Sequence, residues 1–149
     1  MKLKMERNRI LNLLSLSEVN LDNLLEGESA KRIYSDIFNN IEDFPLKEDS
    51  QLDQEDLNLE KIEIHIRDKL SGLNPSRVIT YCFIGESTVD GIKIHLGLFL
   101  ENISNFVKLL TINGYVNEFV IAEDNGEPVI ALEITEYKSR MLRFDEKLS

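Results

Sequence analysis

The two histidines, His65 and His95, are the side chains best suited to acid–base chemistry, because imidazole titrates near neutral pH. Each lies in a segment that alternates apolar and polar residues, 61–67 and 92–100. Such alternation predicts two half-buried strands with both histidines on the polar face. If these strands were neighbours, the pair could form a two-histidine site for phosphodiester cleavage, assisted by Glu63 or Lys93. This is the catalytic hypothesis that the sequence offers.

The residues around the histidines depart from that pattern. Two-histidine phosphoesterases carry Ser or Thr two residues after each histidine, and here those positions hold Arg67 and Gly97. A strand predicted over 78–84 would also lie between the two histidine strands and hold them roughly 9 to 10 Å apart. We therefore expect both histidines on a solvated sheet face, with a small hydrolase as the alternative.

Metal sites are also poorly matched. Four residues fall at positions 1, 3, 5 and 12 of a calcium-binding loop, namely Asp49, Gln51, Asp53 and Glu60. The loop glycine is replaced by Gln54, and Leu57 occupies a ligand position. One cysteine and two histidines without helical spacing do not make a tetrahedral zinc set. We expect no metal and no cofactor.

Two residues, Cys82 and Ser87, are candidates for a catalytic nucleophile, but the residues around them do not support this role. Cys82 lies in the apolar segment 78–84, where a thiol is expected to be an inert packing group. Ser87 follows Gly85 but lacks the second glycine of a nucleophile elbow. The chain also has no glycine-rich phosphate loop. We therefore expect a protein without enzymatic activity.

Charge is the most informative property of this chain of 149 residues, whose net charge is −10. Segment 42–60 carries eight acids against one base, Lys47, and segment 82–136 carries nine acids against two lysines. A negative field repels nucleic acid, so direct nucleic-acid binding is not expected. The same field accelerates encounter with a basic protein.

The order of predicted elements indicates an α+β fold: N-terminal helices followed by a mostly antiparallel five-stranded sheet with one inserted helix. Residues 1–42 form the helical region, in which Ile33, Ile37 and Ile41 recur at steps of four. Pro45 ends it, and 43–59 is predicted as an acidic loop. Five strands are predicted over 61–67, 78–84, 92–100, 116–122 and 129–134, within a sheet region of 60–136.

Two further features complete the predicted fold. The inserted helix spans 102–112 and is expected to end at Gly114, and Asp124-Asn125-Gly126 predicts a hairpin between the last two strands. The tail, 137–149, spaces Tyr137, Met141 and Phe144 as a final helix would. The length predicts a single domain.

The environment of the protein follows from what the sequence lacks. No stretch approaches the roughly 20 apolar residues of a membrane span. The single cysteine cannot form an intramolecular disulfide, which favours a reducing, cytoplasmic location. We therefore expect no membrane association.

These observations favour a binding protein: an inhibitor or immunity-type protein that neutralises a basic partner such as a nuclease toxin. Its contact residues are predicted in two groups. The first group consists of Asp43, Glu48, Asp49, Asp53, Glu55 and Asp56, and the second of Glu118, Glu123, Asp124 and Glu127. A structural or adaptor subunit that self-associates through a strand edge is the other alternative.

Overall fold

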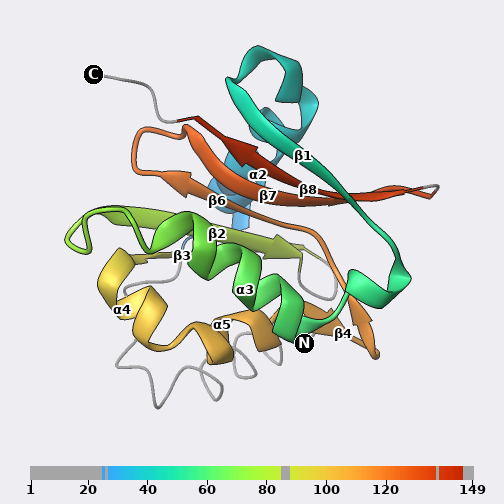
Figure 1. The fold of residues 1–149 in the computed structure, drawn as a ribbon. Helices are drawn as coiled ribbons and strands as arrows, with labels where there is room; N and C mark the ends of the chain where they lie inside the picture. Colours follow the sequence, from blue (N-terminus) through green and yellow to red (C-terminus); the bar gives the residue numbers. More distant parts are fainter. Residues whose placement is uncertain (1–24, 26, 85–87, 137, 146–149) are drawn as a thin grey trace.

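Six antiparallel strands form the main sheet, in the order β1-β8-β7-β6-β2-β3 (Figure 1). The computed structural model describes residues 25, 27–84, 88–136 and 138–145. The strands are β1 (Leu46–Leu52), β2 (Val78–Ile84), β3 (Val89–His95), β6 (Phe119–Glu123), β7 (Pro128–Ile134) and β8 (Ser139–Phe144). A separate hairpin consists of β4 (Thr111–Ile112) and β5 (Tyr115–Val116). The predicted α+β class is confirmed, with six strands in the sheet instead of five.

Helices cover both faces of this sheet. Helix α2 (Gly27–Asn39) lies on one face, while α3 (Leu59–Leu70), α4 (Leu96–Glu101) and α5 (Ile103–Lys108) lie on the other (Figure 1). Two short 3-10 turns, η2 (Ile41–Asp43) and η3 (Gln54–Asp56), flank β1. None of the helices in the described part of the chain is long and apolar enough to cross a membrane.

The α2 face of the sheet is built from small residues. Cys82, Ala122 and Ala131 are buried beneath the helix, and Gly91 lies directly under Ala30. A Cβ atom at Gly91 would come within 2.9 Å of the Ala30 Cβ. The close approach of helix and sheet therefore depends on the missing side chain.

The opposite face carries an aromatic cluster. Tyr81 from β2 packs against Phe83, Phe99, Phe106 and Phe119, with ring centroids 5.1 to 6.1 Å apart. The Tyr81 hydroxyl is fully buried and donates a hydrogen bond to the Phe106 carbonyl at 2.9 Å. This bond satisfies the one polar group of the cluster and ties β2 to α5.

The strand predicted over 61–67 is wrong, because this segment lies within helix α3. Ile62 and Ile66 are fully buried one turn apart, whereas Ile64 between them is 59% exposed. The Asn58 side chain caps the helix by accepting from the Lys61 amide at 2.9 Å. Ile62, Ile66 and Leu70 recur at steps of four and share one buried helical face, whereas Ile64 fits only the alternating pattern.

Strand 78–84 is predicted between two histidine strands, but of these three segments only β2 and β3 are strands that pair with each other. The strand predicted over 92–100 ends at His95, where α4 begins. The helix predicted over 102–112 is shorter, since α5 ends at Lys108. Gly114 has a positive φ of 82°, but it lies beside Asn113 in the β4–β5 turn and does not cap the helix.

Two segments predicted as loop and helix are strands. The acidic segment 43–59 contains β1, which pairs with β8 although most of its side chains are exposed. The tail contains β8, which pairs with both β1 and β7. Because backbone pairing needs no apolar face, hydrophobic periodicity does not reveal a polar edge strand.

Other predictions are confirmed. Strand 78–84 coincides with β2, and the Asp124-Asn125-Gly126 turn joins β6 and β7 with Gly126 at a φ of 88°. The described end of the predicted helical region 1–42 corresponds to α2 and η2. The helices expected before residue 25 lie outside the described residues.

Adding a methyl group at the crossing of α2 and β3 tests this packing. Gly91→Ala should destabilise the fold by about 1–3 kcal/mol, because the new Cβ overlaps Ala30 in a tightly packed layer. The measurement is the free energy of unfolding in urea. Gly72→Ala is the matched control, since nothing lies within 4 Å of its Cβ position. Equal stability of the two variants would contradict the close packing.

Candidate functional site

The structure separates the two histidines. His65 lies on α3, where its Nδ1 lies 2.9 Å from Nη2 of Arg143 on β8. His95 ends β3, and its Nδ1 lies 3.1 Å from the Ser76 carbonyl. Strands β7, β6 and β2 lie between β8 and β3, which places those two strands roughly 19 Å apart. The geometry therefore does not bring the histidines together as a catalytic pair.

His65 belongs to a polar cluster around Arg143. The guanidinium also donates to Asp68 at 2.6 Å, and Glu48 lies 3.9 Å away. Burial and the charge of Arg143 lower the pKa of His65 below its usual value. His65 therefore accepts the hydrogen bond of Arg143 as a neutral imidazole and serves the contact between α3 and β8.

Cys82 has the environment of a packing residue. Its side chain is buried under α2 in the layer of small residues. Burial raises the pKa of the thiol to about 12, so the reactive thiolate is not populated near neutral pH. Within the described residues, no group of three His, Cys, Asp or Glu side chains is placed to hold a metal ion.

Three residues of the second predicted group contact other elements of the fold: Glu118 and Glu123 are partly buried, whereas the Asp124 side chain is 63% exposed. Glu118 is partly buried and accepts hydrogen bonds from the Tyr34 hydroxyl and from the Ile134 amide, the latter at 2.7 Å. Glu123 pairs with Arg77 at 2.9 Å, and Asp124 pairs with Lys93 at 2.6 Å. These carboxylates already join one element to another, which leaves them less free to bind a partner.

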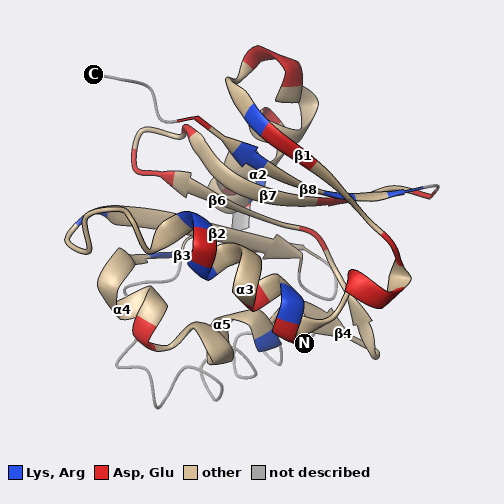
Figure 2. Cartoon of the chain, viewed as in Figure 1, with Lys and Arg blue, Asp and Glu red and all other residues tan. Residues whose placement is uncertain are grey.

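The first group lies along one edge of the sheet. Its carboxylates run from η2 through β1 to η3, the outermost segment of the sheet beyond β8 (Figure 2). Asp43, Glu48, Asp49, Asp53 and Glu55 are exposed, and Asp56 is partly exposed. We call these six residues the acidic edge. It is the strongest candidate for a binding surface in the described part of the chain.

Some members of the acidic edge also have structural partners. Asp53 caps η3 by accepting from the Asp56 amide, and Asp56 pairs with Lys61 at 2.8 Å. Asp49 accepts from Arg140 at 2.7 Å, and Arg140 is also paired with Glu133 at 2.9 Å. The edge therefore combines tethered carboxylates with others that face solvent.

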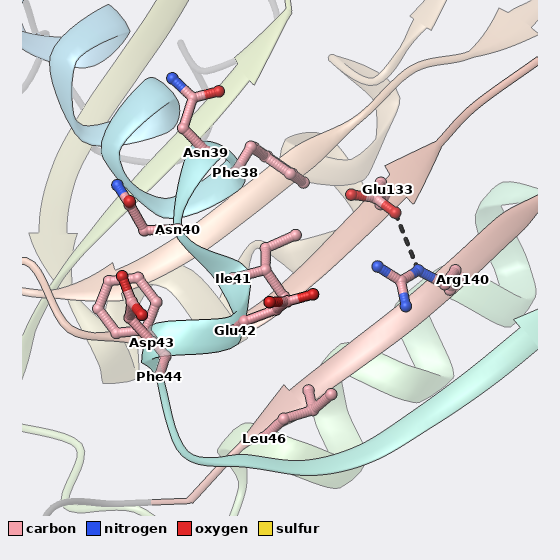
Figure 3. A pocket seen from close by; sticks show the side chains of 10 residues that line it. All are labelled: Phe38, Asn39, Asn40, Ile41, Glu42, Asp43, Phe44, Leu46, Glu133 and Arg140. Atoms are coloured by element: carbon pink, nitrogen blue, oxygen red, sulfur yellow. Dashed lines mark hydrogen bonds and ion pairs between the residues drawn. The ribbon is translucent and has the colours of Figure 1, made fainter.

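A pocket lies beside the acidic edge, at the end of α2 (Figure 3). It has a volume of about 720 Å³, and no sequence pattern predicts it because its residues come from α2, η2, β1, β7 and β8. The lining residues are Phe38, Asn39, Asn40, Ile41, Glu42, Asp43, Phe44, Leu46, Glu133 and Arg140. Apolar side chains and carboxylates thus share one cavity.

Removing the Glu118 carboxylate tests its structural role. Glu118→Ala should lower the free energy of unfolding by about 1.5–3 kcal/mol, because two donors lose a charged acceptor. Glu101→Ala, on an exposed residue of α4, is the control. Equal stability of both variants would mean that Glu118 is available to a partner.

The pH dependence of stability tests the His65–Arg143 contact. Because the folded pKa of His65 lies below its unfolded value, the unfolded chain takes up the proton first as the pH falls. The His65 contribution is therefore present above the unfolded pKa of about 6.5 and declines as the pH falls through it. His65→Gln should flatten this part of the curve when urea unfolding is measured from pH 7.5 to 5. An unchanged curve would contradict the contact.

Comparisons with known proteins do not assign the chain to a family. No protein-family model matches the chain, and neither curated proteins nor solved structures give a match.

Proposed function

We propose that this protein is a non-catalytic binding protein that neutralises a basic partner protein, such as a nuclease toxin, as an inhibitor or immunity-type protein does. The observation that carries the proposal is the acidic edge, whose exposed carboxylates follow one another along β1 and its flanking turns. A nuclease must attract phosphate, so its active site presents the complementary positive charge. Carboxylates in a row are a suitable counterpart.

The geometry also favours one of the two predicted contact groups. Glu118 and Glu123 make partly buried internal contacts, whereas Asp43 and Glu55 are exposed residues of the turns beside β1. Breaking a partly buried pair costs more than exchanging an exposed one, so Glu118 and Glu123 gain less from a partner. We therefore propose that the interface lies on the acidic edge. We also propose that the protein is cytoplasmic.

A self-associating adaptor is the second candidate, and the position of β1 favours it. β1 pairs with β8 and is the last strand of the sheet, so no strand of the described residues pairs with its outer backbone edge. Such an edge can add a strand from another chain. Pairing of two copies would, however, place two acidic β1 strands side by side, and their like charges would repel each other. A basic strand is the better match.

Affinity capture from the native lysate tests the proposal. The tagged protein should retain a basic protein in stoichiometric amount at low salt and release it at high salt, because exposed charge pairs are screened. Mass spectrometry identifies the retained protein. Capture that is indifferent to salt, or concentration-dependent self-association alone, would contradict the inhibitor hypothesis.

Charge reversal locates the interface. Glu48→Lys combined with Glu55→Lys should slow association with the captured partner by roughly tenfold at low salt, and less at high salt. The control is Glu28→Lys with Glu101→Lys, which changes the net charge equally at exposed sites on α2 and α4. Equal effects of the two double variants would mean that only net charge matters, and would remove the interface from the acidic edge.

A further inference from the structure

The pocket beside the acidic edge has a wall of apolar side chains. Phe38, Ile41 and Leu46 line it, and Leu46 is 38% exposed. Figure 3 shows these three side chains directed toward the space in front of Glu133 and Arg140. An occupant therefore needs an apolar portion to cover them.

The charges of the pocket select against an anion. Arg140 is the one cationic side chain among the described lining residues, and it is already paired with Glu133 at 2.9 Å and with Asp49 at 2.7 Å. Glu42 adds a further carboxylate, and its side chain points toward the same space (Figure 3). Asp43 is another carboxylate that lines the pocket. The surplus of carboxylates favours a cation.

One common group combines an apolar stem with a cation, namely a long basic side chain. Arginine fits better than lysine, because its planar guanidinium can stack on the Phe38 ring while forking onto a carboxylate such as Glu42. The volume of about 720 Å³ exceeds one side chain and leaves room for the backbone that carries it.

We propose that this pocket receives an arginine side chain of the basic partner, with the stem against Phe38, Ile41 and Leu46 and the guanidinium on Glu42 and Glu133. This inference rests on the proposed function and names the anchor residue of that partner. Leu46 is the first residue of β1, so the pocket continues the acidic edge. Arginine anchors in such pockets often dominate the affinity of an interface.

Nuclear magnetic resonance titration of isotopically labelled protein with N-acetyl-arginine amide tests the proposal without the partner. Amide shifts should concentrate in residues 38–46 and at Glu133 and Arg140. The neutral citrulline analogue should give none at the same concentration. Shifts of equal size with citrulline, or no localised shift with the arginine amide, would overturn the proposal.

Variants and two further probes sharpen the result. Glu42→Gln should weaken arginine-amide binding roughly two- to fivefold, as loss of an exposed ion pair does, whereas Glu101→Gln should leave it unchanged. Tighter binding of N-acetyl-lysine amide would overturn the choice of arginine. Tenfold tighter binding of free arginine, with its own amine and carboxylate, would identify a small-molecule site instead.

The two proposals can fail separately. A partner that is captured by the wild-type chain and lost by the acidic-edge variant, while the arginine amide leaves the pocket unmoved, would remove the arginine anchor alone. Arginine-amide binding at the pocket without any captured basic partner would remove the proposed function alone.

Discussion

Burial of β2 on both of its faces is the constraint on which the rest of the structure depends. Five consecutive residues of this strand are buried, from Ile79 to Phe83. Side chains alternate across a strand, so each face requires its own cover. The face with Cys82 is matched by the close approach of α2 over Gly91, and the face with Tyr81 by aromatic rings from α4 and α5. The two layers of helices follow from these two kinds of surface.

The far side of the sheet is held together differently. β1 has few buried side chains, and two arginines of β8 hold its acids from opposite faces: Arg140 pairs with Asp49, and Arg143 approaches Glu48. Ion pairs at exposed edges contribute little stability individually, so this edge relies on its backbone pairing with β8. An edge of this kind can exchange its ion pairs for those of a partner at a low cost. The acidic edge and its pocket lie where the apolar core ends.

The sequence predicted what strong local signals encode. The apolar run of β2 and the Asp124-Asn125-Gly126 turn were recognisable, because each fits a single structure. Segment 61–67 of α3 alternates as a strand does, but Ile62, Ile66 and Leu70 also recur at the helical step of four, and Asn58 before Leu59 is a capping signal. β1 and β8 depend on pairing between distant segments, as does the pocket, which draws on residues from 38 to 140. No local sequence pattern predicts such long-range pairings. The charge of segment 42–60, by contrast, was enough to predict the residues of the acidic edge.

Amide hydrogen exchange of the protein, alone and bound to its captured partner, tests the location of the interface most directly. The account predicts new protection concentrated in residues 38–56, which span the end of α2, the pocket, β1 and η3, with little change in α4 and α5. Protection centred on α4 and α5 or on the β6–β7 turn, with none along β1, would contradict it.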